Sequence, residues 1–248
     1  MAKGNNKKER IDKIISSRGI ASRSEAKLLV KKGQVTLNGI IVTDSSVKAG
    51  EDDVISVNGE VISRERYVYI MLNKPEGVVS ATDDKRYKTV VDIIPDEFRR
   101  RNLFPAGRLD KDTTGFCLVT DDGEFAHNIL SPSRHITKTY IARLASPIDF
   151  EEGKRRFEEG VVLKDGTVLL SAKLMLIEDS ETPLYKVVIK EGKYHQIKRM
   201  FASLGSKVIE LKRIAMGGLA LDESLKPGEA RLITPEELKA IVENDERI

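Results

Sequence analysis

Near the middle of the chain lies the stretch Pro105-Ala106-Gly107-Arg108-Leu109-Asp110-Lys111-Asp112-Thr113-Thr114-Gly115. It places two carboxylates, two cations and two hydroxyls between glycines, a composition typical of a loop. The apolar run Phe116–Val119 follows at once, so the loop leads directly into a predicted strand. Aspartates in such a loop are more often turn or capping residues than catalytic ones. The meaning of Asp110 and Asp112 therefore depends on what accompanies them.

Strand-like and helix-like segments alternate on both sides of this loop. The predicted strands are Tyr67–Leu72, Phe116–Thr120, Lys138–Leu144, Val168–Ile177, Tyr185–Lys190 and Val208–Ile214. The predicted helices are Glu124–Leu130, Phe150–Glu159, Tyr194–Leu204 and Pro235–Glu243. Long strands separated by irregular helices predict an α+β domain with a mixed, mostly antiparallel sheet flanked by helices. Because no glycine-rich nucleotide-binding motif follows a strand, a methyltransferase or an ATPase is disfavoured.

The charge of the chain is distributed unevenly. Residues 1–32 contain ten basic and three acidic side chains, a net charge of +7. The other residues contain 32 basic and 36 acidic side chains, a net charge of −4. A basic N-terminal segment on a slightly acidic body indicates a polyanion-binding module joined to a second domain. The competing interpretation is an ordinary solvated surface with a basic tail.

Residues 10–60 predict a small module of their own. Isoleucines at positions 11, 14 and 15 give one face of a short helix that ends near Gly19. Ser22 and Glu25 match a capping box for a second helix, Arg23–Lys32. Asn-Gly turns at positions 38–39 and 58–59 predict two β-hairpins. Basic side chains on paired helices suit the phosphates of RNA, whose base edges are hidden in the major groove.

Residues 8–55 resemble the S4 RNA-binding domain. The resemblance is carried by Ser16, Arg18, Gly19, Ser22, Arg23, Glu25 and Ala26, and then by Gly33, Val35, Asn38 and Gly39. We therefore expect an S4 domain at residues 8–62 and a catalytic domain at residues 66–248. The side chains expected to contact RNA from the first domain are Arg10, Lys13, Arg18, Arg23, Lys27 and Lys31.

Three further motifs accompany the aspartate loop in the second domain. They are Met71-Leu72-Asn73-Lys74-Pro75-Glu76-Gly77, Lys138-Thr139-Tyr140 and Gly192-Lys193-Tyr194-His195-Gln196-Ile197-Lys198-Arg199-Met200. Together with Gly107-Arg108-Leu109-Asp110, these motifs in this order resemble the pseudouridine synthases, and more closely the subfamily typified by the ribosomal small-subunit pseudouridine synthase A. The resemblance covers about residues 8–240.

The resemblance implies a role for five residues of the second domain. Asp110 is expected to be the nucleophile and Tyr140 to stack on the target base and help move its C5 proton. Lys198 is expected to keep Asp110 ionised, because a desolvated carboxylate needs a cation beside it. Arg108 is expected to contact the RNA near the extruded nucleotide. Ile197 is expected to line the pocket, although its helical spacing with Met200, Phe201 and Leu204 also predicts a core position.

The expected reaction is the isomerisation of a uridine in small-subunit (16S) ribosomal RNA, free or in a subunit assembly intermediate. It needs no cofactor. A metal site is not expected, because the single cysteine, Cys117, and three scattered histidines do not form a ligand cluster. His195 is expected to be a structural, hydrogen-bonded histidine rather than a base. The absence of a long apolar run or a secretory signal predicts a cytoplasmic protein, and the absence of a coiled-coil stripe predicts a monomer.

Three alternatives remain open from the sequence. A large-subunit pseudouridine synthase is the first, and the short segment after Ile241 favours the small subunit over it only slightly. A non-catalytic ribosome-assembly factor is the second, although such a relative is expected to have lost Asp110 or Tyr140. A glycosidase-like pair of Asp110 and Asp112 is the third, and it is disfavoured because both carboxylates lie on one short loop instead of facing each other across a cleft.

Overall fold

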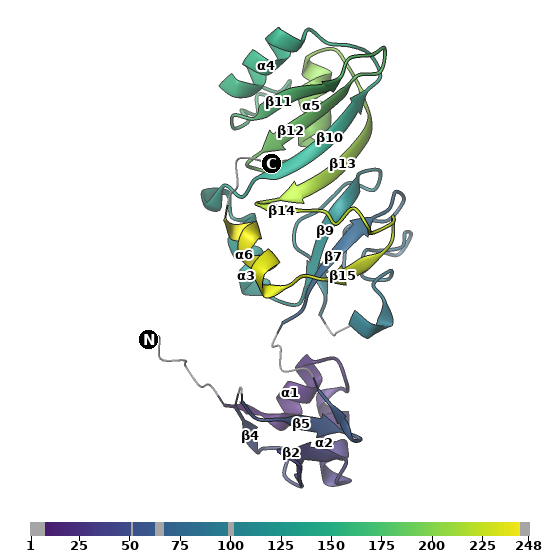
Figure 1. Cartoon of the computed structure of the whole chain (residues 1–248), viewed down its shortest axis with the longest axis vertical. Helices are drawn as coiled ribbons and strands as arrows, with labels where there is room; N and C mark the ends of the chain where they lie inside the picture. Colours follow the sequence, from purple (N-terminus) through teal and green to yellow (C-terminus); the bar gives the residue numbers. More distant parts are fainter. Residues whose placement is uncertain (1–7, 51, 63–66, 99–101, 244–248) are drawn as a thin grey trace. The chain divides into compact units, whose positions relative to one another are not determined.

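The computed structural model describes residues 8–50, 52–62, 67–98 and 102–243 (Figure 1). By its contacts the chain forms two compact units. One is Met1–Val68 with Asp96–Leu103, and the other is Tyr69–Pro95 with Phe104–Ile248. Residues 63–66, where the sequence places the domain boundary, lie outside the described residues, as do residues 1–7 and 244–248. The domain limits 8–62 and 66–248 stay a prediction.

The first unit combines two helices with short antiparallel strands. Its elements are β1 (Glu9–Arg10), α1 (Ile11–Ser17), α2 (Arg23–Lys31), β2 (Val35–Leu37), β3 (Ile40–Ile41), β4 (Lys48–Ala49), β5 (Ile55–Val57) and β6 (Glu60–Val61). Strand β1 pairs with β4, and the other four strands form a sheet in the order β3-β2-β5-β6. Both predicted hairpins are present, because Asn38 and Asn58 adopt the positive φ that an Asn-Gly turn requires.

Helix α2 begins as its sequence predicts. The Ser22 hydroxyl accepts a hydrogen bond from the backbone N–H of Glu25, and the Glu25 carboxylate accepts one from the N–H of Ser22. These two bonds satisfy backbone donors that the first helical turn leaves unpaired. The apolar faces of α1 and α2 then meet in the small core of this unit, where Ile11, Ile15 and Val30 are fully buried.

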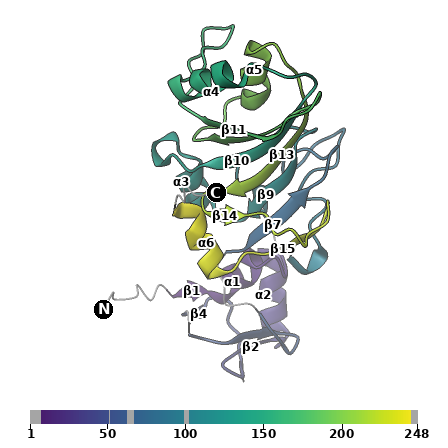
Figure 2. The same cartoon turned by 45° about the horizontal axis from the view of Figure 1, so that its top comes forward.

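The second unit is built on a sheet of nine strands (Figures 1 and 2). They are β7 (Tyr69–Lys74), β8 (Phe104–Pro105), β9 (Thr114–Thr120), β10 (Lys138–Leu144), β11 (Lys173–Glu178), β12 (Leu184–Ile189), β13 (Val208–Met216), β14 (Leu219–Ala220) and β15 (Ala230–Leu232). The main order is β11-β12-β10-β13-β9-β7-β15, while β8 pairs with β9 and β14 with β13. Among the described strands, only β9 and β13 run parallel. The predicted α+β class with a mixed, mostly antiparallel sheet is confirmed.

Four α-helices pack against this sheet: α3 (Gly123–Leu130), α4 (Phe150–Glu159), α5 (Gln196–Ser203) and α6 (Pro235–Val242). Helix α4 packs on β11 and α5 on β13. Helices α3 and α6 lie side by side in both views (Figures 1 and 2) and share one apolar core. A short 3₁₀ turn, Pro132–Arg134, also belongs to this unit, whereas the 3₁₀ turn Asp96–Phe98 belongs to the first unit. Cys117 lies in β9, within the strand predicted from Phe116 to Thr120, and is a free, buried cysteine.

The parallel contact between β9 and β13 depends on Gly115. This residue has φ +93°, and a Cβ atom there would lie 2.2 Å from the carbonyl oxygen of Arg213. Arg213 is itself buried and donates a hydrogen bond from Nε to the carbonyl of Phe116 over 2.7 Å. Only glycine fits so close an approach of two backbones, so the end of the aspartate loop is locked against β13.

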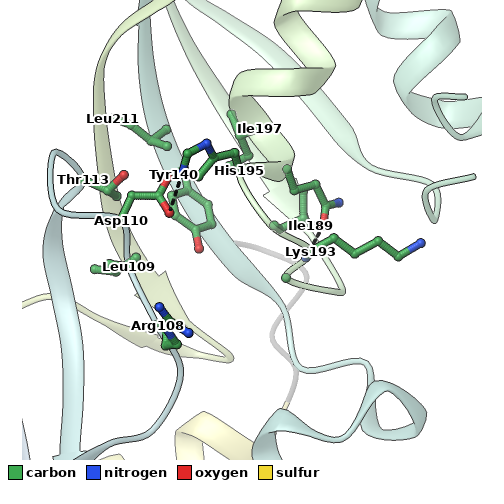
Figure 3. A pocket seen from close by; sticks show the side chains of 12 residues that line it. Arg108, Leu109, Asp110, Thr113, Tyr140, Ile189, Lys193, His195, Ile197 and Leu211 are labelled. Carbon is green, nitrogen blue, oxygen red and sulfur yellow. Dashed lines mark hydrogen bonds and ion pairs between the residues drawn. The ribbon is translucent and has the colours of Figure 1, made fainter. Parts of the chain in front are cut away.

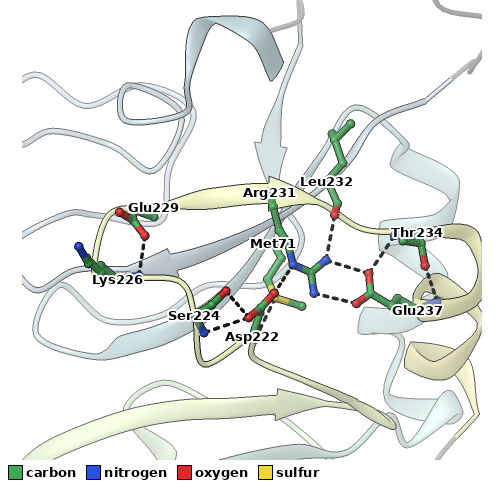
Figure 4. Close-up of polar contacts among 9 residues, drawn as sticks. All are labelled: Met71, Asp222, Ser224, Lys226, Glu229, Arg231, Leu232, Thr234 and Glu237. Atoms are coloured by element: carbon green, nitrogen blue, oxygen red, sulfur yellow. Dashed lines mark hydrogen bonds and ion pairs between the residues drawn. The ribbon is translucent and has the colours of Figure 1, made fainter.

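An ionic cluster ties the C-terminal elements together (Figure 4). Arg231 on β15 donates to Asp222 over 2.6 Å and to both carboxylate oxygens of Glu237 over 2.7 and 2.9 Å. Glu237 also completes the capping box of Thr234 at the start of α6. Hydrogen bonds from Ser224 and from Arg231 lower the pKa of Asp222 to about 2. The carboxylate therefore stays charged at neutral pH, and the cluster joins β15 to α6.

Two predicted elements differ from the structure. The strand predicted from Val168 to Ile177 is observed only as β11, Lys173–Glu178. The preceding residues bond to the end of α4 instead, since Leu169 N–H donates to Val161 and Ala172 N–H to Phe157. The helix predicted from Tyr194 begins at Gln196, because His195 has a left-handed φ of +48° that breaks the helical path. The short strands β8, β14 and β15 were not predicted.

Candidate active site

The aspartate loop is held by bonds to its own backbone. It joins β8 to β9, and its turn closes with a hydrogen bond from Thr113 N–H to the carbonyl of Asp110 over 3.1 Å. Just before Asp110, the N–H of Leu109 donates to the hydroxyl of Ser80 over 3.0 Å. Leu109 and Thr113 are both buried. The Asp110 side chain is therefore carried on a fixed backbone while its carboxylate stays partly exposed.

A buried lysine lies beneath this loop. Lys74, the last residue of β7, is fully buried, and its Nζ donates to the carbonyls of Pro75, Lys111 and Thr113 over 3.0, 3.2 and 2.8 Å. Burial lowers the pKa of Lys74 from 10.5 to about 8, although Asp112 and Asp110 act in the opposite direction. The lysine joins the end of β7 to the part of the loop that directly follows Asp110.

Helix α5 supplies the cation that the sequence predicts for Asp110. Lys198 Nζ lies 2.9 Å from Oδ2 of Asp110 and 2.6 Å from Oδ1 of Asp112. Burial lowers the pKa of Lys198, but its hydrogen bonds to Asp112 and Asp110 outweigh burial and raise the pKa above its ordinary value. Burial also raises the pKa of Asp112, and the bond from Lys198 reverses this, so the net shift is downward. Lys198 therefore remains an ammonium group beside two carboxylates.

Tyr140 and Ile197 lie in the same pocket as Asp110 (Figure 3). Tyr140 is on β10 and is only 7% exposed. The register of β10 against β13 shifts between Thr139 and Tyr140, and such an irregularity re-aims the next side chain. Ile197, in the first turn of α5, is buried as core spacing predicts and also lines the pocket. Ile189 and Leu211, which the sequence did not single out, complete the wall of the pocket together with Leu109 and Thr113 of the aspartate loop.

His195 also lines the pocket, and the sequence did not predict its approach to Asp110. Its Nε2 lies 3.5 Å from Oδ1 of Asp110, on the opposite carboxylate oxygen from Lys198 (Figure 3). The left-handed φ of His195 places it at the N-cap of α5 without a side-chain capping bond. The ring is thus directed to the pocket instead of the helix. Its place in the Gly192–Met200 motif could have indicated a residue of the active site. The sequence instead favoured a structural role, because structural histidines are more frequent than catalytic ones.

A wider groove opens next to the pocket. Its volume is about 940 Å³, and it shares Arg108, Leu109, Asp110 and His195 with the pocket. Arg108 is exposed, and Figure 3 places it at the edge of the pocket away from Ile197. Of the predicted residues, Tyr140 and Ile197 line the pocket and Lys198 lines the groove. Arg108 and Asp110 line both, so these two residues connect the two cavities.

The six basic residues predicted to contact RNA in the first unit fall into two groups. Arg10 and Arg23 both bind the buried carboxylate of Asp12, over 3.0 and 3.4 Å, and Lys13 binds Glu9 over 2.5 Å. Arg18 is half-buried and donates to the hydroxyl of Ser17 over 3.4 Å.

Lys27 and Lys31 differ from these four. They are exposed one turn apart on α2, and no ion pair joins them to any residue that the structure describes. These two lysines are the basic side chains of α2 most available to a phosphate.

Within the described residues no group of three or more His, Cys, Asp or Glu side chains could hold a metal ion. No helix in the same part of the chain is both long enough and apolar enough to pass through a membrane.

Comparisons with known proteins agree on one family. A model of RNA pseudouridylate synthases matches residues 68–203, and a model of the S4 domain matches residues 9–55. The chain is 42% identical to the ribosomal large subunit pseudouridine synthase B of Bacillus subtilis, over 94% of this chain and 95% of that protein. It is 40% identical to the ribosomal small subunit pseudouridine synthase A of Vibrio vulnificus, over 94% of this chain and 99% of that protein. A crystal structure of a pseudouridylate synthase aligns with a TM-score of 0.65 at 39% identity. The alignment covers 94% of this chain and 99% of the chain in the crystal structure.

Proposed function

The chain belongs to the RNA pseudouridylate synthase family, and from this premise we propose that it isomerises one uridine of small-subunit ribosomal RNA to pseudouridine, with Asp110 as the catalytic nucleophile. The observation that carries this proposal is the ion pair between Asp110 and Lys198 at the mouth of a pocket that Tyr140 lines. A carboxylate that must act as a nucleophile has to stay ionised while partly desolvated, and an ammonium group 2.9 Å away favours that state.

The reaction itself needs only rearranged bonds. The bond between ribose C1′ and uracil N1 breaks, a bond between C1′ and C5 forms, C5 loses its proton and N1 gains one. Atoms and electrons balance without an oxidant, a reductant or a second substrate. Asp110 acts by attack at uracil C6, by attack at ribose C1′, or by promoting a glycal intermediate, and each route uses the same ionised carboxylate.

Tyr140 and Arg108 take complementary roles in the proposal. The ring of Tyr140 is buried beside Asp110, where it can stack on an inserted uracil, and its hydroxyl is the candidate carrier for the C5 proton. Arg108 lies exposed where the pocket meets the groove and suits the phosphate next to the extruded nucleotide. Flipping the uridine out of its stack costs a few kcal/mol, and RNA contacts elsewhere on the protein offset this cost.

The S4 domain is proposed to supply those distant contacts. Lys27 and Lys31 on α2 are its most accessible predicted phosphate ligands. Because backbone contacts carry little sequence information, this domain would set affinity and salt dependence while the pocket selects the nucleotide. We propose that the protein acts as a monomer in the cytoplasm, where its ribosomal substrate is assembled.

A second candidate substrate is large-subunit ribosomal RNA. It is favoured by the 42% identity to the large subunit synthase B of Bacillus subtilis, which slightly exceeds the 40% identity to the small subunit synthase A of Vibrio vulnificus. Both candidates share the same chemistry and the same pocket residues. They differ only in the RNA that carries the uridine, so one mapping experiment separates them.

Pseudouridine mapping tests the proposal directly. Both ribosomal RNAs are treated with carbodiimide and read by primer extension, in cells that lack the protein and in cells rescued with wild type, Asp110→Asn or Asp112→Asn. We expect one small-subunit site to disappear in the deletion, and to be restored by wild type and not by Asp110→Asn. The matched control Asp112→Asn removes a carboxylate from the same loop and the same lysine, and it should restore the site at least in part.

Other outcomes are equally informative. A site missing from the large subunit would transfer the assignment to that RNA. Restoration by Asp110→Asn would contradict the role of Asp110, and an unchanged pattern in both RNAs would contradict a ribosomal substrate. The same mapping on free RNA and on isolated assembly intermediates, each incubated with purified protein, identifies the form of the substrate.

A further inference from the structure

An exposed tyrosine stands at the edge of the groove. Tyr194 is 75% exposed, and its ring stacks on the ring of His195 with centroids 3.8 Å apart and planes inclined by 18°. One face of the tyrosine therefore rests on a neighbour and the other is open to solvent. A single exposed apolar side chain needs no explanation by itself, so the way this ring is held and the place where it lies decide its meaning.

The backbone that carries Tyr194 is firmly fixed. The N–H of Lys193 donates to the side-chain oxygen of Gln196 over 2.9 Å, and the N–H of Gln196 returns a bond to the carbonyl of Lys193 over 3.1 Å. Gln196 is 4% exposed and also donates to Glu191 over 3.0 Å. Because the turn is closed by bonds on both sides, the exposed ring is pre-organised and loses little freedom on binding a partner.

The turn is anchored to the rest of the unit as well. Glu191 accepts a hydrogen bond from the N–H of Leu170 over 2.8 Å, and Lys193 Nζ donates to the carbonyl of Val168 over 2.7 Å. His195, beneath the tyrosine, holds a left-handed φ of +48° that a non-glycine residue adopts only at some cost in free energy. The surrounding bonds thus maintain a conformation that directs His195 inward and leaves Tyr194 outside.

The position of the ring relates it to the reacting nucleotide. His195 Nε2 is 3.5 Å from the carboxylate of Asp110, and the same ring stacks on Tyr194, so His195 contacts both the nucleophile and the exposed tyrosine. Tyr194 lines the groove together with Arg108, while Tyr140 lies inside the pocket. A nucleotide bound at Asp110 would have its chain neighbour at the groove, within reach of the open face of Tyr194.

We propose that Tyr194 is a stacking platform for the base adjacent to the target uridine, a second nucleobase subsite outside the catalytic pocket. This inference rests on the proposed function. When a uridine is flipped out of a strand, its neighbours lose a stacking partner. An aromatic ring with one open face replaces that partner and tolerates any base, because every base presents a π face. The subsite therefore adds to the affinity for the extruded RNA without selecting sequence.

The test compares side chains that keep or lose the ring. Tyr194→Phe keeps the aromatic face, and Tyr194→Leu keeps apolar bulk without it. Ribosomal RNA from cells lacking the protein serves as the substrate, and pseudouridine formation is measured under steady-state and single-turnover conditions. We expect Tyr194→Leu to raise KM about tenfold, the effect of losing one base stack. Its single-turnover rate at saturating enzyme should be unchanged, and Tyr194→Phe should match wild type.

Each other kinetic outcome has a distinct meaning. If wild type forms no pseudouridine in either ribosomal RNA, the proposed function fails and not merely the subsite. If wild type is active and Tyr194→Leu has the same KM, the subsite is overturned. A lower rate with an unchanged KM would overturn it too, because Tyr194 would then act only by supporting His195 against Asp110.

A fluorescence experiment detects the stack itself. Short RNA transcripts spanning the mapped site carry 2-aminopurine on the 5′ or the 3′ side of the uridine, and stacking on an aromatic ring quenches its emission. Wild type and Tyr194→Phe should quench one of the two transcripts, and Tyr194→Leu should not. Equal emission from both transcripts with all three proteins at saturation would contradict the proposal.

Discussion

Lys198 Nζ donates a 2.9 Å hydrogen bond to Asp110 Oδ2, although 88 positions separate these residues in the chain. The loop between β8 and β9 carries the carboxylate, and the first turn of α5 carries the lysine. His195, three residues before Lys198, approaches the other carboxylate oxygen at 3.5 Å. Both oxygens of Asp110 therefore face the start of α5, and a shift of this helix would change the orientation of the carboxylate.

The first prediction concerns the charge of Lys198. Lys198→Met removes the cation that favours ionised Asp110, and we expect kcat to fall about 100-fold, as on removal of one electrostatic contact in an active site. Lys198→Arg keeps the charge and should retain most activity. Single-turnover rates of pseudouridine formation with ribosomal RNA measure the effect. Equal rates for Lys198→Met and wild type would show that the ion pair is not required.

The second prediction concerns Lys74, which holds three backbone carbonyls around the aspartate loop. Lys74→Met leaves these carbonyls without their donor, and we expect the free energy of unfolding to fall by about 1–3 kcal/mol. Urea titration measures this change. The activity should fall while the affinity for RNA stays constant, because the loop that loosens carries Asp110 and not the S4 domain.

Lys74 also makes the stability of the folded chain depend on pH, in a direction that its pKa shift determines. Its pKa is lowered to about 8 in the folded chain by burial, against 10.5 in the unfolded chain. Between these values the unfolded chain binds more protons, so the Lys74 contribution to stability rises with pH from about 8 to 10.5. Lys74→Met should lack this rise when urea midpoints are compared across the range. If the curves of urea midpoint against pH run parallel for the two proteins, the buried position of the ammonium group is contradicted.

Much of this architecture follows from local sequence patterns. The capping box of Ser22, the two Asn-Gly hairpins, and the strand Lys138–Leu144 form where the sequence predicts them. Each of these depends on residues within a few positions of one another. The approach of Lys198 to Asp110 was also expected, but only because four motifs together resemble one family, since no local pattern relates residues so far apart.

The missed features share a non-local cause. His195 meets Asp110 because a left-handed residue before α5 turns the ring inward, and no composition rule predicts that turn. Lys74 is buried because three carbonyls from separate positions converge on it. Likewise, Val168–Ala172 has strand composition yet bonds back to the end of α4. Tertiary hydrogen bonds override local propensity at each of these sites.

The third prediction concerns Asp12, whose buried carboxylate binds Arg10 and Arg23. Burial raises the pKa of Asp12, but the hydrogen bonds from both arginines outweigh it and the net shift is downward. A lowered folded pKa stabilises the domain above the unfolded value of 3.8, and this contribution disappears as the pH falls through the folded pKa. Asp12→Asn should lower the free energy of unfolding by about 1–3 kcal/mol at neutral pH. In urea titrations from neutral to acid pH, the difference in the free energy of unfolding between this variant and wild type should become smaller below pH 3.8.

The fourth prediction separates the two groups of basic residues in the S4 domain. Arg10, Lys13 and Arg23 are paired with carboxylates, whereas Lys27 and Lys31 are exposed on one face of α2. A free ammonium group that binds a phosphate releases a counterion, so each bound phosphate adds about 0.7–0.9 to the slope of log Kd against log salt. The double variant Lys27→Ala/Lys31→Ala should lower this slope by that amount for each phosphate it no longer binds, and it should weaken RNA binding at every salt concentration.

A matched control for that variant is Lys48→Ala. Lys48 is an exposed lysine of β4 in the same unit and was not predicted to contact RNA. Filter binding of ribosomal RNA over a range of salt concentrations should give the wild-type slope for Lys48→Ala and a shallower slope for the double variant. The single-turnover rate at saturating enzyme should stay the same in both, because neither change touches the pocket around Asp110. Equal slopes for the two variants would place the phosphate contacts of the S4 domain on another face.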